Sequence, residues 1–315
     1  MIMRPEQMDF SKQKFSMIIY GAPGIGKTTL ALSAPNPILL DFDHGISRVA
    51  AKHRKPTSVS DTYEEVLADI NSPEIKDFDT IVIDTGGSFV TYLKDWALRT
   101  KPDAKMKNGA FNSLKGFGYV KSEFQSFTER IKTVLNKNVI YVFHSTEEKD
   151  KDGNPTQRLM CEGAARNTVW NGCDFGGYIQ MIGNKRTLCF SPEQEFFAKG
   201  THGITGHLTV PNLDANTPND FVTRLFETAR QNIIAEKNEF EPQKAQYEAV
   251  MMDIKAVIDG IVDEQSADLA LDTIPKMNHA LTSLAEARAM MKERTDSLGL
   301  KYDKKAGGYI KKVTE

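Results

Sequence analysis

The chain has 315 residues, of which 40% are hydrophobic and 26% are charged, and its formal net charge is −2. This composition is typical of a globular protein with one large domain and an extension, or with two domains, and it excludes a uniformly basic nucleic-acid-binding protein. Three cysteines without C-x-x-C spacing argue against a disulfide framework or a zinc site, and the lack of a long apolar run or a signal-like N-terminus leads us to expect a cytoplasmic protein with no membrane partner.

The first predicted element is an apolar strand at residues 15–20, and a phosphate-binding motif follows it directly. Residues 21–28 read Gly-Ala-Pro-Gly-Ile-Gly-Lys-Thr and match the whole P-loop pattern. Its glycines let backbone N–H groups curl around phosphates, and the helix that should follow adds a favourable field for anions. We expect Lys27 to reach the β- and γ-phosphates of ATP and the Thr28 hydroxyl to bind Mg²⁺. The predicted nucleotide-binding residues are Gly21, Ala22, Pro23, Gly24, Ile25, Gly26, Lys27, Thr28 and Thr29.

The second predicted strand, residues 38–41, ends beside two carboxylates. Asp41 and Asp43 fall on the same face if the strand extends that far. A carboxylate at this edge of a sheet could polarise the water that attacks ATP, and we place Asp43 ahead of Asp41 in that role. The alternative is a solvated acid or a helix cap.

The third predicted strand, residues 80–84, is apolar and ends in Asp84, which is typical of a Walker B motif. Asp84 is therefore predicted to hold the Mg²⁺ shell, through water. The next residue is Thr85, whereas helicases and AAA+ machines often place their water-activating Glu there. The catalytic base must then come from elsewhere in this chain.

The fourth predicted strand, residues 139–144, ends in His144, where a γ-phosphate should lie. We interpret His144 as a phosphate sensor, and the alternative is a histidine that merely hydrogen-bonds at a strand end. Further strands are expected at 177–182 and 187–191, and helices at 29–33, 62–71, 88–100 and 119–135. This β-α-β alternation predicts a P-loop α/β fold, a three-layer α/β/α sandwich.

Two segments, 101–118 and 146–167, combine cations with aromatic residues or glycines. Such segments suit single-stranded DNA, since phosphates meet Lys and Arg while bases stack at about 1–3 kcal/mol each. The alternative is an ordinary polar surface, which the acidic residues of the second segment favour. The candidate DNA-binding residues are Lys101, Lys105, Lys107, Lys115, Phe117, Lys149, Lys151, Arg158 and Arg166.

The region after Pro218 is predicted to be helical, with helices at 219–236, 243–262 and 266–298. Pro242 should break the chain between the first two helices, and Pro275 should divide the last. The basic end of the chain, residues 301–312, could be a small hairpin around its Gly-Gly pair or a flexible arm.

We therefore divide the chain into an ATPase core at residues 1–228 and a helical extension with a basic tail at residues 229–315. The extension could serve as an oligomerisation or partner module, or it could pack on the core.

The order of these motifs resembles the RecA-like recombinase core, and within it the Sak-type single-strand annealing ATPases of bacteriophages. The resemblance covers roughly residues 12–228. It implies that Asp43 is the catalytic carboxylate, normally Glu in that family, and that His144 is the γ-phosphate sensor. It also implies that the two cation-rich segments are the DNA-binding loops. In that family a neighbouring subunit supplies a basic residue to each ATP site, and Lys199 is the candidate here.

The leading hypothesis is a DNA-dependent ATPase in the cytoplasm of a phage-infected or prophage-carrying bacterial host. It would bind single-stranded DNA as a homo-oligomer, in a ring or filament, and would promote single-strand annealing with ATP and Mg²⁺. A single-strand-binding protein is a possible partner. The alternatives are a replication helicase-like motor or helicase loader, a P-loop small-molecule kinase, and a binding module that holds ATP as a switch.

Overall fold

The computed structural model describes residues 8–163, 165–213 and 216–312. The chain separates into two compact units, Met1–Asn232 and Ile233–Glu315. The first unit is an α/β fold, as predicted. None of the described helices is long and apolar enough to cross a membrane.

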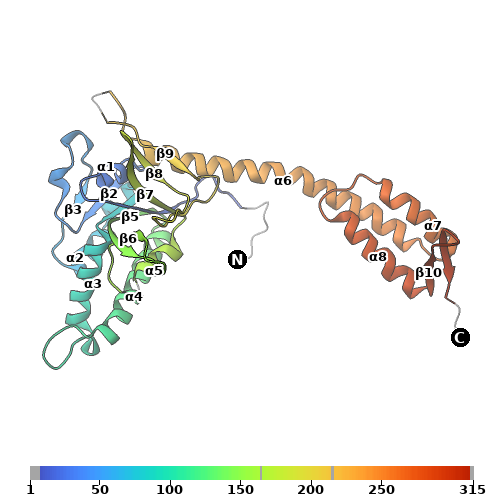
Figure 1. Cartoon of the computed structure of the whole chain (residues 1–315), viewed down its shortest axis with the longest axis horizontal. Coiled ribbons are helices and arrows are strands. Elements are labelled where there is room, and N and C mark those ends of the chain that lie inside the picture. Colours follow the sequence, from blue (N-terminus) through green and yellow to red (C-terminus); the bar gives the residue numbers. More distant parts are fainter. Residues whose placement is uncertain (1–7, 164, 214–215, 313–315) are drawn as a thin grey trace. The chain divides into compact units, whose positions relative to one another are not determined.

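A nine-stranded sheet forms the centre of the first unit (Figure 1). Its strand order is β3-β2-β4-β5-β1-β7-β8-β9, and β6 pairs with β5. The path from β3 to β7 is parallel, whereas β8 and β9 join antiparallel. The strands are β1 (Ser16–Gly21), β2 (Pro37–Asp41), β3 (Thr57–Ser58), β4 (Thr80–Asp84), β5 (Asn138–Lys149), β6 (Pro155–Leu159), β7 (Phe175–Ile182), β8 (Lys185–Cys189) and β9 (His207–Thr209).

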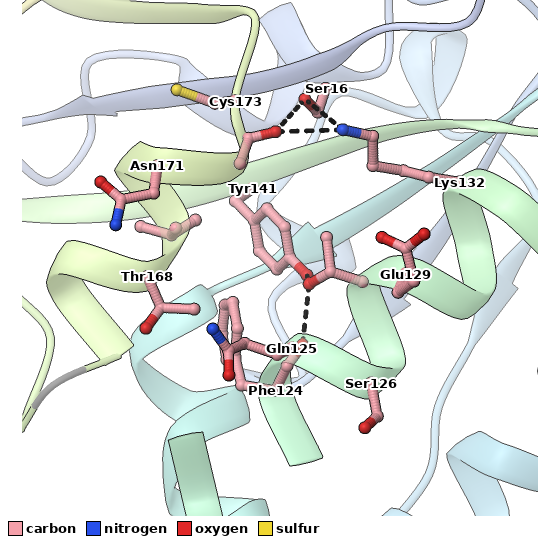
Figure 2. Close-up of a pocket in the computed structure, with 13 residues that line it drawn as sticks. Ser16, Phe124, Gln125, Ser126, Glu129, Lys132, Tyr141, Thr168, Asn171 and Cys173 are labelled. Carbon is pink, nitrogen blue, oxygen red and sulfur yellow. Dashed lines mark hydrogen bonds between the residues drawn. The ribbon is translucent and has the colours of Figure 1, made fainter. Parts of the chain in front are cut away.

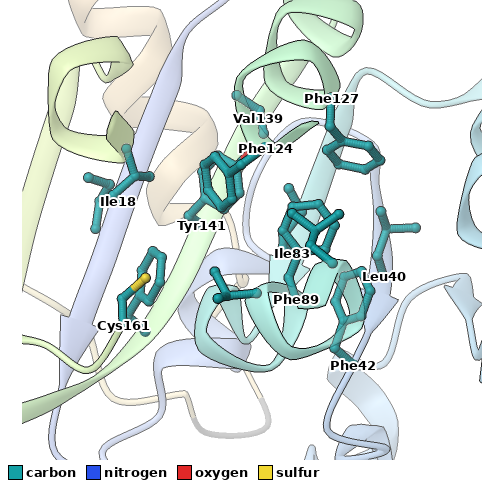
Figure 3. Close-up of a cluster of buried hydrophobic side chains, with 14 of the residues drawn as sticks. Ile18, Leu40, Phe42, Ile83, Phe89, Phe124, Phe127, Val139, Tyr141 and Cys161 are labelled. Atoms are coloured by element: carbon teal, nitrogen blue, oxygen red, sulfur yellow. The ribbon is translucent and has the colours of Figure 1, made fainter. Parts of the chain in front are cut away.

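The longer helices of this unit are α1 (Lys27–Ala31), α2 (Tyr63–Asn71), α3 (Gly86–Thr100), α4 (Ser113–Glu129) and α5 (Ala165–Gly172). A π-helical turn, η6 (Arg130–Val134), continues α4. Aromatic side chains from α3, α4 and the strands fill the core, and Figure 3 shows part of it. The rings of Phe89 and Phe127 lie 4.8 Å apart, and Phe42 packs on Phe89 at 5.0 Å. This packing fixes α3 and α4 against the sheet, whose carboxyl-terminal strand ends carry the predicted site.

The predicted helix at 119–135 begins earlier than expected, at Ser113. Asn112 caps it by accepting hydrogen bonds from the N–H groups of Leu114 and Lys115. Gly116, which resembled a loop residue, lies inside the helix because Phe111 packs against it: a Cβ there would lie 2.4 Å from the ring. Part of the first cation-rich segment is therefore helix rather than loop.

The second cation-rich segment was expected to be a loop, but most of it is a β-hairpin. β5 runs on to Lys149 and pairs antiparallel with β6. β6 escaped prediction because its residues Pro155–Leu159 are mostly polar, and β3 and β9 are too short to show a hydrophobic alternation.

The second unit contains most of α6 (Phe221–Asp259), then α7 (Glu264–Thr273), the 3₁₀ turn η7 (Ile274–Lys276) and α8 (Ser283–Ser297). The predicted break at Pro242 is wrong, because α6 continues through it. Proline costs about 3 kcal/mol inside a helix, and the helix-forming residues on both sides outweigh that cost here. The predicted division at Pro275 is confirmed. The basic end forms a hairpin, β10 (Leu300–Asp303) with β11 (Gly308–Lys311), which is the first of the two alternatives left open by the sequence.

Candidate nucleotide-binding site

The P-loop joins β1 to α1 at the edge where the parallel strands end. β5 lies between β1 and β4, so the register sets Gly21 opposite His144. The same register sets Asp84 of β4 opposite Asp41 of β2. Four strands thereby deliver the P-loop and three predicted polar residues to one edge, which is where open α/β sheets bind ligands.

Three P-loop glycines occupy positions that a side chain would disturb. Gly24 and Gly26 have φ values of 77° and 94°, in the left-handed region. At Gly21, a Cβ would lie 2.5 Å from the carbonyl oxygen of Ile179 on β7. The glycine pattern of the motif is therefore required both by backbone conformation and by contact with the neighbouring strand.

Lys27 points back into the loop. Its Nζ donates to the carbonyl oxygens of Gly21 at 3.1 Å and Ala22 at 2.8 Å, and it lies 3.3 Å from Nδ1 of His144. Burial lowers the pKa of Lys27 to about 8, against the opposing pull of Asp84 and Asp43. A bound phosphate would favour the charged ammonium. The Lys27 ammonium thus binds backbone oxygens of the loop in which phosphates would lie.

Thr28 and Asp84 form the candidate Mg²⁺ site. The Thr28 Oγ1 donates to the Asp84 carboxylate at 2.5 Å. Burial raises the pKa of Asp84 to about 6, the hydrogen bond from Thr28 opposes this rise, and the Asp43 and Asp41 charges add to it. Within the described residues no group of three His, Cys, Asp or Glu side chains could hold a metal ion. This donor set fits Mg²⁺, which binds through few carboxylates together with waters and substrate phosphates.

Asp43 faces the site from the loop after β2. Its carboxylate accepts a hydrogen bond from the Ser88 hydroxyl and one at 3.4 Å from the Thr85 hydroxyl. Its other oxygen lies 3.9 Å from Nε2 of His144. The side chain is 24% exposed, which leaves room for a water. Sequence reasoning missed Thr85 and Ser88, which orient this carboxylate.

Asp41 has a different role, because both of its oxygens are occupied. They accept hydrogen bonds from the backbone N–H groups of Gly45 and Ile46, each at 2.8 Å. Asp41 thus fixes the loop that carries Asp43. The catalytic role of Asp43 stays a prediction.

His144 lies between Lys27 and Asp43. Burial and the Lys27 charge lower the pKa of His144, Asp43 opposes this shift, and Arg48 adds to it. The imidazole is therefore neutral at pH 7 and can accept from Lys27 or meet a phosphate oxygen.

Lys199 does not reach this site in its own chain. Its Nζ donates to the Cys173 carbonyl at 2.5 Å, and its backbone pairs with Gly176 near the start of β7. That position is at the opposite edge of the sheet from the P-loop. Its role in a neighbouring subunit stays a prediction.

Several of the candidate DNA-binding residues contact other side chains of the protein. In the first segment, Lys101 lies over the Trp96 ring at 5.0 Å, and Lys115 on α4 pairs with Asp103 at 3.2 Å. Phe117 also lies on α4 and packs edge-on against Phe111. No ion pair of Lys105 or Lys107 occurs in the described part of the chain.

In the second segment, Arg166 pairs with Glu148 at 2.8 Å. Arg158 on β6 stacks over the Phe197 ring at 3.7 Å. Lys149 pairs with Pro155 in the last residue pair before the hairpin turn, and Lys151 lies in that turn. These two lysines are the cations of the segment best placed to meet a ligand.

A cavity with a volume of about 530 Å³ lies away from the nucleotide-binding residues (Figure 2). It is lined by residues of α4, η6 and α5 together with Ser16, at the start of β1. Lys132 donates to Ser16 and to the Gly172 carbonyl there. Because β1 begins at Ser16 and ends at the P-loop, this cavity is separate from the nucleotide site.

Comparison with known proteins identifies the family of this chain. A family model described as an AAA domain matches residues 13–202, which is more than half of the chain and includes the P-loop, Asp43, Asp84 and His144. The chain is also similar to the SPbeta prophage-derived uncharacterized protein YorG of Bacillus subtilis (strain 168), with 24% identity over 136 residues. That match covers 42% of this chain and 41% of the relative.

Proposed function

We propose that the chain, which belongs to the AAA domain family of P-loop ATPases, hydrolyses ATP and acts in a DNA recombination reaction. In this proposal it binds single-stranded DNA as a homo-oligomer, a ring or filament, and promotes annealing of complementary strands. ATP at the subunit interface sets the affinity for DNA, and hydrolysis releases the strand. The similarity to a prophage-derived protein supports action in a phage-infected or prophage-carrying host.

The observation that carries the ATPase part is the meeting of Lys27, Asp84, Asp43 and His144 at one edge of the sheet. Lys27 would leave the loop carbonyls for the β- and γ-phosphates. Thr28 and Asp84 would hold Mg²⁺, which neutralises the charge that develops on the phosphates. Asp43, oriented by Ser88, would orient and polarise the attacking water.

Coupling to DNA is supported by the course of one strand. β5 carries His144 at the site and continues for five residues to Lys149 in the hairpin. The return of the chain is tied to the same residue, since the Met160 N–H donates to the His144 carbonyl at 2.8 Å. A shift of His144 toward a γ-phosphate would therefore move the hairpin. Lys105, Lys107, Lys149 and Lys151 are the residues we propose for phosphate contacts with DNA.

The test is ATP hydrolysis with and without single-stranded DNA, with DNA retention measured by gel shift in the same samples. Lys27→Ala is the control for the P-loop. We expect hydrolysis that DNA stimulates, nucleotide-dependent DNA binding and annealing of complementary strands. A rate of ATP hydrolysis that DNA does not change, together with no retained DNA, would refute the recombination proposal. Strand displacement would indicate a motor or loader instead, and phosphate transfer to a small acceptor would indicate a kinase.

A further inference from the structure

A cavity of about 410 Å³ lies directly beside the P-loop. Its lining includes Gly26 and Thr29, and also Arg186 of β8 and His53. The described lining includes two cations, Arg186 and Lys52, and no Asp or Glu. Burial and the Lys52 charge lower the pKa of His53, which adds no positive charge at pH 7. The volume lies in the range of small-molecule sites, and this charge pattern favours an anionic ligand.

The wall of this cavity is anchored to the P-loop helix. The Asn219 side chain donates to the Thr29 carbonyl at 3.0 Å. Just beyond it, the Val222 N–H donates to the Ser33 hydroxyl at 2.9 Å, and the Thr223 hydroxyl donates to the Ser33 carbonyl at 2.8 Å. Asn219 is thus fixed to α1, and the start of α6 is fixed to Ser33, just beyond the end of α1, so the cavity has a defined wall.

Arg186 places its guanidinium against the P-loop. A Cβ on Gly26 would lie 3.5 Å from its Cζ and 3.6 Å from its Nε. The backbone of Arg186 is held on both sides, because it pairs with Met181 of β7 and its carbonyl accepts from the Val210 N–H at 2.8 Å. The guanidinium therefore reaches Gly26 from a fixed strand position.

One donor of this guanidinium lacks an acceptor. The Arg186 Nε is buried and has no hydrogen-bond partner, and no ion pair joins Arg186 to a carboxylate within the residues that the structure describes. A buried N–H without an acceptor is costly, and a ligand oxygen would satisfy it. Arg186 thus offers an unpaired donor beside Gly26 of the P-loop.

We propose that Arg186 binds the phosphate nearest the nucleoside and that the cavity holds the ribose and base. This inference rests on the proposed ATPase function and gives the nucleotide a direction. The γ-phosphate lies toward His144 and Asp43, and the nucleoside lies beyond Gly26 and Thr29. Arg186 acts from the same chain as the P-loop, whereas the predicted role of Lys199 requires a neighbouring subunit.

The experiment measures binding of ATP, ADP and inorganic tripolyphosphate by calorimetry to the full chain. Arg186→Ala should weaken ATP and ADP at least tenfold, and Arg186→Lys should recover part of that loss. Lys185→Ala, at the exposed neighbour on the same strand, is the matched control and should bind like the wild type. Thermal unfolding of each variant without ligand checks that the fold is intact.

A second variant separates the cavity from the phosphates. Ala50 is exposed at the cavity wall, so Ala50→Trp adds bulk there without changing the core. We expect it to weaken ATP at least fivefold and to leave tripolyphosphate unchanged. If the wild type binds ATP while Arg186→Ala binds it within twofold and Ala50→Trp has no effect, the inference is wrong and the ATPase proposal stands. If the wild type binds no ATP, both fail.

Discussion

Replacing Asp84 with Asn should make the nucleotide-free protein more stable while it abolishes function. Burial raises the pKa of Asp84 from 3.8 to about 6 in the folded state. The folded protein therefore binds the carboxyl proton of Asp84 more tightly than the unfolded chain does. The stability that this proton gives the folded state is fully present below about pH 4 and is lost as the pH rises through 6. At about 1.4 kcal/mol per tenfold change in proton affinity, the loss is about 3 kcal/mol at pH 8.

Asp84→Asn removes that cost and retains an oxygen that can accept from Thr28. At pH 8 the variant should be more stable by up to about 3 kcal/mol, which corresponds to about 6–12 °C in Tm for a unit of this size. The attraction of Lys27 for the Asp84 carboxylate is already contained in the pKa of about 6, so it does not reduce this figure further. At pH 4.5, where the ordinary carboxyl is itself partly protonated, the difference should narrow to about 1 kcal/mol.

The assay is thermal unfolding without nucleotide at pH 8 and pH 4.5, followed by the same measurement with Mg²⁺ and ATP. The variant should lose the stabilisation that Mg²⁺ and ATP give the wild type. Asp41→Asn is the matched control, because Asp41 accepts two backbone hydrogen bonds and its replacement should lower the Tm. A lower Tm for Asp84→Asn at pH 8, or a gain that does not depend on pH, would refute the reasoning.

Three further substitutions test the site and its coupling. Asp43→Asn should lower kcat for ATP about 100-fold or more with ATP affinity nearly unchanged, and undiminished turnover in a steady-state assay would remove Asp43 from catalysis. Gly21→Ala should abolish ATP binding in calorimetry, because its Cβ would lie 2.5 Å from the Ile179 carbonyl; wild-type affinity would contradict this packing argument. Lys149→Glu with Lys151→Glu should weaken DNA retention about tenfold or more in gel shifts and leave DNA-free hydrolysis intact, whereas unchanged retention would exclude the hairpin as a DNA contact.

The sequence alone was sufficient for the parts of the site that are encoded locally. The P-loop is a contiguous motif, so its glycines and Lys27 could be assigned without knowledge of any distant contact. The buried parallel strands appear as apolar runs. Asp84 ends one of these runs, and His144 directly follows the apolar run of β5, although that strand continues to Lys149. Because parallel strands end at one edge of a sheet, their meeting followed from the strand assignment.

Tertiary structure decided which of these residues touch and which distant residues join them. Only the strand order places β5 beside β1, and so places His144 next to Lys27. Polar strands such as β6 carry no periodic signal, so the hairpin was read as a loop. Arg186 lies 160 residues after Gly26 and meets it only because β7 and β8 extend the sheet past β1. Local patterns record burial and backbone preference, whereas such contacts depend on how separate elements pack.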